Sequence, residues 1–99
     1  MSWQYRAEAW IVPKARISEN LDSIRRYLTQ NQVKFKEEHT RIFGNWEGFN
    51  FHILFFPERY KGEDAVKVQL HLTYTDNRKR IMKKIDGFAS GLLSQINKK

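Results

Sequence analysis

Hydrophobic and polar residues alternate along four stretches of the chain, and alternation with a period of two is typical of half-buried β-strands. These stretches cover residues 3–12, 33–43, 49–56 and 66–74, with a turn expected over 44–48 and a longer loop over 57–64. In two further stretches the apolar residues recur every three or four positions, which predicts amphipathic helices over about residues 18–31 and 77–97. Ser18 and Asp76 are the predicted N-caps of these helices.

The order of these elements, β-α-β-β-β-α, predicts an α+β fold with two layers. The first connection contains a helix and is long enough for a parallel crossover, whereas the three later strands fit an antiparallel meander. We therefore expect a four-stranded sheet that is mixed or antiparallel. Each helix has a single apolar stripe, so both helices should cover the same face of the sheet and leave the other face open.

The strand patterns also predict which side chains line the open face. In the first strand, the side that carries Ala7 and Ile11 is expected to face the helices, and the side that carries Arg6 and Trp10 to face solvent. The predicted open face combines cations, amides and rings: Gln4, Arg6, Glu8, Trp10, Asn50, His52, Lys67, Gln69, His71 and Thr73.

Length and composition narrow the class of protein. A chain of 99 residues allows one domain, residues 1–99. It contains no cysteine, which excludes disulfides and thiolate zinc sites and suits a reducing compartment. Its hydrophobic stretches are short and interrupted by charges, and its first residues lack the apolar run of a secretory signal. We therefore expect a cytoplasmic protein without a membrane segment.

The formal net charge of +7 is concentrated in the last third of the chain. Residues 1–64 contain ten lysines and arginines against nine acidic residues, whereas residues 65–99 contain eight against two. Five cations fall within seven positions at the start of the last predicted helix: Arg78, Lys79, Arg80, Lys83 and Lys84. Cations there oppose the helix dipole and repel one another, so a bound anion would explain them. The alternative is a solvated basic face that Asp76 compensates in part.

These features predict a nucleic-acid-binding domain that acts as an accessory or regulatory factor, with RNA or single-stranded DNA as the favoured partner. The basic start of the helix would contact phosphates, and the open sheet face would stack on bases. The other expected binding residues come from the sheet and from the loop over 57–64: Arg6, Trp10, Lys67, His71, Arg59, Tyr60 and Lys61. No motif indicates a catalytic centre, a small-molecule substrate, a cofactor or a metal site.

Two functions of other classes are compatible with the same residues. A small ribonuclease would use His52 and His71 as general acid and base, provided that the strand register places them opposite each other. Another register would instead bring His39 opposite His52. A protein-interaction module would hold an acidic protein partner, or a second copy of the chain, through the Trp10 face or the last helix.

Gly87 and Gly91 lie four residues apart inside the last predicted helix, where each glycine costs about 1 kcal/mol relative to alanine. This cost is tolerable if the helix approaches a neighbour closely, either the sheet or a second copy of the chain. A helix break near Gly87 is the competing interpretation. The helix end, with Leu92, Leu93 and Ile96, is the predicted surface for a homodimer.

Overall fold

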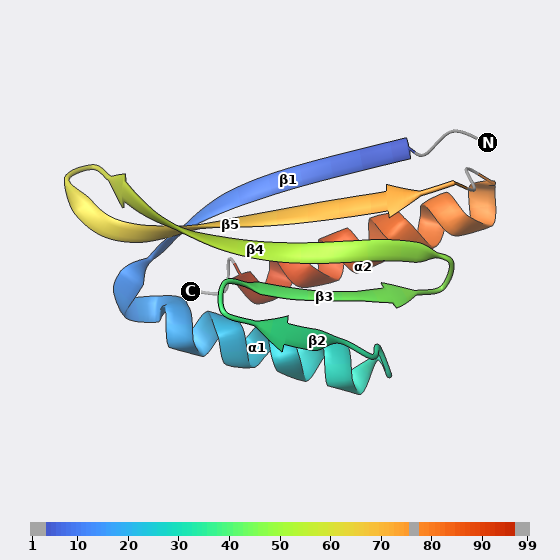
Figure 1. Ribbon diagram of the computed structural model, residues 1–99, viewed down its shortest axis with the longest axis horizontal. Helices are drawn as coiled ribbons and strands as arrows, with labels where there is room; N and C mark the ends of the chain where they lie inside the picture. The colour runs from blue at the N-terminus through green and yellow to red at the C-terminus, as the bar shows by residue number, and fades with distance from the viewer. Residues whose placement is uncertain (1–3, 76–77, 97–99) are drawn as a thin grey trace.

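The computed structural model describes residues 4–75 and 78–96 and has two layers, a five-stranded sheet and a pair of helices behind it (Figure 1). The elements in chain order are β1 (Gln4–Pro13), α1 (Ile17–Gln30), β2 (Lys36–Glu38), β3 (Arg41–Trp46), β4 (Phe49–Tyr60), β5 (Glu63–Tyr74) and α2 (Lys79–Ile96). The α+β class and the packing of both helices on one face agree with the sequence-based prediction. Within the described residues, neither helix is long and apolar enough to cross a membrane.

The strands lie in the order β1-β5-β4-β3-β2, and every neighbouring pair is antiparallel. The predicted count of four strands is wrong because the stretch over 33–43 is split: β2 and β3 form a hairpin that turns at His39 and Thr40. The first connection is a parallel crossover, as its length allows, because β1 and β2 run in the same direction, but it does not join neighbouring strands. The α1 connection carries the chain to the far edge of the sheet, so β1 and β2 lie at opposite edges and β1 pairs with β5.

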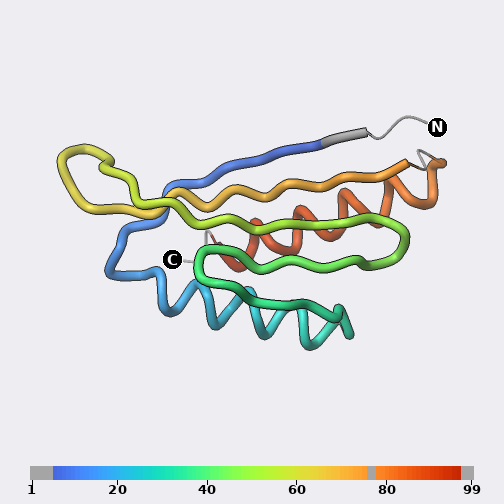
Figure 2. The backbone as a smooth tube through the Cα atoms, in the orientation of Figure 1, coloured from blue at the N-terminus to red at the C-terminus, as the bar shows by residue number. Residues whose placement is uncertain are grey.

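Strands β4 and β5 are longer than predicted, because residues 57–64 form the end of a hairpin instead of a loop. Lys61 and Gly62 make the turn with φ angles of 53° and 79°, and two positive values suit a two-residue hairpin turn. Pro57 is tolerated inside β4 because β3 pairs with β4 only as far as Leu54, so that β5 is its only neighbouring strand there. The hairpin projects beyond the rest of the sheet (Figure 2).

Helix α1 begins at Ile17, directly after a 3-10 turn at Lys14–Arg16, and not at the predicted cap Ser18. The buried Asn20 side chain explains this start. Its Nδ2 donates a hydrogen bond to the Arg16 carbonyl at 2.8 Å and so joins the 3-10 turn to the helix. Asp76, the predicted cap of α2, lies outside the described residues.

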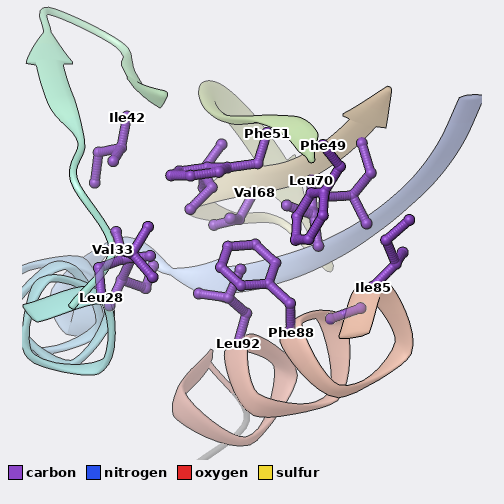
Figure 3. Packing of buried hydrophobic residues seen from close by; sticks show 14 of the residues in the cluster. Leu28, Val33, Ile42, Phe49, Phe51, Val68, Leu70, Ile85, Phe88 and Leu92 are labelled. Atoms are coloured by element: carbon purple, nitrogen blue, oxygen red, sulfur yellow. The ribbon is translucent and has the colours of Figure 1, made fainter. Parts of the chain in front are cut away.

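Phe88 of α2 lies at the centre of the core (Figure 3). Its ring centroid is 5.4 Å from that of Phe49 and 5.1 Å from that of Phe51, both on β4. The apolar stripe predicted for α1 is buried against the same cluster through Ile24 and Leu28. Fully burying one such side chain stabilises the fold by about 1.5–3 kcal/mol, so this cluster fixes both helices against one face of the sheet.

Gly91 allows α2 to approach α1 closely. A Cβ atom at this position would overlap the ring of Tyr27, whose hydroxyl donates a hydrogen bond to the Phe88 carbonyl at 3.4 Å. Gly87 faces open space, and the helix is continuous through it. Within the described chain, the close neighbour is therefore α1 and not the sheet. Leu92 and Ile96 are buried in the chain's own core, so of the three residues predicted for a dimer surface at the helix end only Leu93 is partly exposed.

Candidate nucleic-acid interface

The sheet face that points away from the helices is not covered by any element in the described part of the chain (Figure 1). Directly opposite residues of antiparallel strands point to the same face, so the pairing register identifies its side chains. They are Ala7, Ala9 and Ile11 on β1, Lys67, Gln69, His71 and Thr73 on β5, Asn50, His52, Leu54 and Phe56 on β4, and Arg41, Phe43 and Asn45 on β3. The residues of β4 and β5 predicted for the open face all lie on it.

The face assignment of β1 is inverted relative to the prediction. Arg6 pairs with Leu72 and Trp10 with Val68, so both side chains point to the helix side of the sheet. Arg6 forms ion pairs with Asp86 of α2 and, at 3.0 Å, with Glu8. Trp10 packs against the hydrophobic core. These two residues are therefore separated from Lys67 and His71, with which the sequence analysis had grouped them.

A row of rings crosses the open face through Phe43, His52 and His71 on the three strands β3, β4 and β5. The rings of Phe43 and His52 are stacked, with centroids 5.7 Å apart and an interplanar angle of 11°. The guanidinium carbon of Arg41 lies 4.4 Å from the centroid of the Phe43 ring. We call these four residues the ring row. Because ring faces and cations are the groups that bind unpaired bases, it is the best candidate base-binding site on the molecule.

Arg41 and Phe43 were not among the residues predicted for the binding surface. Both belong to the stretch over 33–43, where alternation is weak because a hairpin interrupts it. The strong alternation of β4 is the signal that could have located them. Phe43 lies directly opposite His52, and Arg41 directly opposite Leu54, so both share the face that the β4 pattern assigns to His52.

The two histidines of the ring row face each other across β4 and β5, as one of the two registers considered for them requires. Burial lowers the pKa of the His52 imidazole below its ordinary value, and the charges of Arg41 and His71 lower it further. A ring nitrogen of His71 lies 3.1 Å from the Gln69 side-chain oxygen. His39 lies in the β2–β3 turn, and no group of three metal-binding side chains occurs among the described residues.

No protein-family model matches the chain, and no curated protein matches it significantly. Besides the ring row, two surfaces hold residues that the sequence analysis proposed.

The first is the start of α2, where Lys79, Arg80 and Lys83 are exposed; we call these three residues the α2 patch. Lys84 is not part of it, because its ammonium group is paired with the Glu47 carboxylate of the β3–β4 turn at 2.5 Å. Arg78 precedes the helix, and its carbonyl accepts a hydrogen bond from the Met82 N–H at 3.0 Å. Because α2 lies behind the sheet, the α2 patch and the ring row belong to opposite sides of the molecule.

The second surface is the tip of the β4–β5 hairpin. The Arg59 guanidinium donates a hydrogen bond to the Gly62 carbonyl at 2.8 Å and lies 3.4 Å from the Asp64 carboxylate. The Lys61 ammonium lies 5.3 Å from the Tyr60 ring centroid, and Tyr60 is 51% exposed. The tip and the start of α2 lie at opposite ends of the molecule (Figure 1), whose longest dimension is 43 Å. The predicted residues thus do not converge on one site.

A groove of about 670 Å³ lies between α1, the β2–β3 turn and the β4–β5 hairpin. Its lining includes the apolar side chains of Ile17, Leu21 and Phe55. Charges of both signs surround them, including the Arg25 guanidinium and the Glu37 carboxylate, which are paired at 2.6 Å. His39 and Arg41 line this groove, but none of the expected nucleic-acid-binding residues does, and its mixed charges do not favour a polyanion.

Proposed function

We propose that this protein binds single-stranded nucleic acid, RNA or DNA, on the open sheet face and acts as a non-enzymatic accessory or regulatory factor in the cytoplasm. The observation that carries the proposal is the ring row, with Phe43 stacked on His52 and Arg41 placed over Phe43 on an uncovered sheet. Stacking on one aromatic ring is worth about 1–3 kcal/mol per base and tolerates any base, because every base has a π-face. A neutral His52, which its lowered pKa favours, can stack without the cost of desolvating a charge.

Phosphate contacts come from two places in this proposal. Arg41 and Lys67 lie on the same face as the ring row and are placed to contact the backbone of a strand whose bases stack there. The α2 patch attracts flanking phosphates from the opposite side of the molecule. The Lys84–Glu47 pair joins the start of α2 to the β3–β4 turn, so a strand would reach both surfaces around this end of the sheet.

The test is the affinity for a labelled single strand of about twelve nucleotides, within the range that small stacking domains cover. Replacing the stacked ring by Phe43→Leu keeps an apolar side chain but removes the π-face. We expect fluorescence anisotropy to show an affinity about tenfold weaker, which corresponds to about 1.4 kcal/mol. The tip of the β4–β5 hairpin, with Arg59, Tyr60 and Lys61, is not part of the binding surface in this proposal, because it lies apart from the ring row. Tyr60→Leu removes an exposed ring there and is the matched control, for which we expect the affinity of the original chain.

The affinity should also fall as salt is raised, with a slope of about −0.7 in log–log form for each phosphate contacted. If the original chain binds no strand at low salt, the proposal is wrong and a protein-interaction module with an acidic partner becomes the better interpretation. Equal losses in Phe43→Leu and Tyr60→Leu would also contradict it.

The opposed positions of His52 and His71 keep the ribonuclease as a second candidate, since an acid and a base must face the same phosphodiester. Under the main proposal, labelled RNA incubated with the protein should stay intact with and without divalent metal. Cleavage that His52→Gln abolishes would favour the ribonuclease instead.

A further inference from the structure

The outer edge of β1 is a long strand edge without a neighbour in the described part of the chain. β1 has ten residues and pairs with β5 on one side only. The opposite edge of the sheet, β2, has three residues, all of them charged. Short, charged edges are the usual protection against pairing with another chain, and β1 does not have the short length that protects β2.

The charges on β1 allow this edge to pair with itself. Arg6 and Glu8 share one face of the strand and flank Ala7 on the other face. Two copies can pair in antiparallel fashion around a two-fold axis perpendicular to the sheet. Even-numbered residues of one strand then lie opposite even-numbered residues of the other, and odd-numbered residues opposite odd-numbered ones. Side chains that lie directly opposite each other therefore point to the same face of the joined sheet. Centring the pairing on Arg6 or on Glu8 places like charges opposite each other. Centring it on Ala7 is the one choice that places Arg6 opposite Glu8 of the second copy, and Glu8 opposite its Arg6.

We propose that the chain forms a homodimer through antiparallel pairing of β1 with β1 of a second copy, with Ala7 opposite Ala7. The register runs from Gln4 opposite Trp10 to Trp10 opposite Gln4, and it joins the two five-stranded sheets into one. Each Arg6 then lies between the Glu8 carboxylate of its own strand, already 3.0 Å away, and the Glu8 carboxylate of the second copy. Opposite charges that face each other across paired strands stabilise the pairing.

This register also joins the two ring rows, a consequence that rests on the proposed function. Ala7 lies directly opposite His71 of β5, so the row Phe43–His52–His71 reaches Ala7 at the sheet edge. With Ala7 opposite Ala7, the row of one copy continues straight into that of the other. Between the two histidine pairs lie the exposed alanines, which leave space for a strand that crosses both copies.

The test measures mass in solution by sedimentation without nucleic acid, so its result does not depend on the proposed function. The original chain should have twice the chain mass of 11.9 kDa. Arg6→Glu places carboxylates of the two copies opposite each other, and Glu8→Arg does the same with guanidinium groups. Each variant alone should therefore dissociate at least about tenfold more readily. In an equal mixture of the two variants, a dimer that contains one of each again has opposite charges at both positions where residue 6 of one copy lies opposite residue 8 of the other. The mixture should therefore return to the dimer mass.

Asp86→Asn is the control, since it removes the ion pair between Arg6 and α2 without changing the strand edge. We expect it to remain dimeric, and circular dichroism should show that all variants are folded. A monomeric original chain at high micromolar concentration would overturn the proposal. So would single variants that stay dimeric, which would indicate another contact surface, or a mixture that stays monomeric.

Discussion

At the scale of single residues, His52 combines a stacked ring with a lowered pKa. Burial against the sheet is the first cause, and the charges of Arg41 and His71 add to it. The folded chain therefore binds a proton at His52 less readily than the unfolded chain does. Where the unfolded state binds more protons, acid favours unfolding, so the same contacts that keep the ring neutral make the fold sensitive to low pH.

We expect this sensitivity to appear as pH falls below about 6.5, the ordinary histidine value. The contribution of His52 to stability is complete above that pH and is lost as pH falls toward the lower pKa of the folded chain. Thermal unfolding should therefore show a larger loss between about pH 7.5 and pH 5 for the original chain than for His52→Gln, which cannot take up the proton. An equal loss in both chains would show that His52 does not titrate differently on folding.

The two glycines of α2 make a matched pair for a second prediction. Gly87→Ala should stabilise the fold by about 0.5–1 kcal/mol, because open space surrounds the added methyl group and alanine favours the helix. Gly91→Ala gains the same helix propensity but drives the methyl group into the Tyr27 ring, and overpacking costs about 1–3 kcal/mol. Its midpoint in thermal unfolding should lie below that of Gly87→Ala. The reverse order would mean that Tyr27 moves aside at little cost.

Individual site residues could be predicted only where the strand pattern is strong. Lys67 and His71 were placed on the correct face because large apolar residues alternate with polar ones throughout β5. Arg6 and Trp10 were placed on the wrong face, since the other side of β1 carries small residues such as Ala7 and Ala9 that fit either environment. The ion pair between Arg6 and Asp86, which fixes the orientation, joins residues too far apart in the chain for periodicity to reveal.

At the scale of elements, α2 begins with cations that the helix dipole disfavours. Lys84 is neutralised by Glu47, but Lys79 and Lys83 lie on the outward face of the first turns. The double variant Lys79→Glu/Lys83→Glu should therefore leave the midpoint of thermal unfolding unchanged or raise it, because acidic residues interact favourably with a helix N-terminus.

The same variant should weaken binding of a single strand and reduce the steepness of its salt dependence, since fewer counterions are released. Lys14→Glu/Lys34→Glu, which changes the net charge equally at two exposed positions outside α2, is the control. If both variants weaken binding to the same extent, the overall charge acts and the α2 patch has no role of its own.

Elements were predicted best where one hydrophobic period runs without interruption. Both helices and the centres of β4 and β5 follow from such runs. The β2–β3 hairpin did not, because its turn at His39 and Thr40 contains neither glycine nor proline. The length of the β4–β5 hairpin was not predicted, because a proline such as Pro57 usually indicates the end of a strand. Pro57 can lie inside β4 because only β5 pairs with β4 at this position, and the β3 side has no paired strand there.

At the scale of the whole molecule, topology decides which surfaces can act together. The layered α+β arrangement could be predicted from element order, but the partner of β1 could not, because the pairing of β1 with β5 depends on contacts between segments far apart in the chain. That pairing turns Arg6 and Trp10 toward the helices and leaves Ala7 and Ala9 on the open face. The ring row and the α2 patch then lie on opposite sides of one sheet.

The central place of Phe88 has a consequence for the way in which the chain is made. The ring that fills the middle of the core lies on the last helix, and the contact between Tyr27 and Phe88 spans 61 positions. While a ribosome is still adding that helix, the apolar side of β4 lacks the cover that Phe88 provides. Folding is therefore expected to finish only after the last helix has been made, and the nascent chain exposes Phe49 and Phe51 until then.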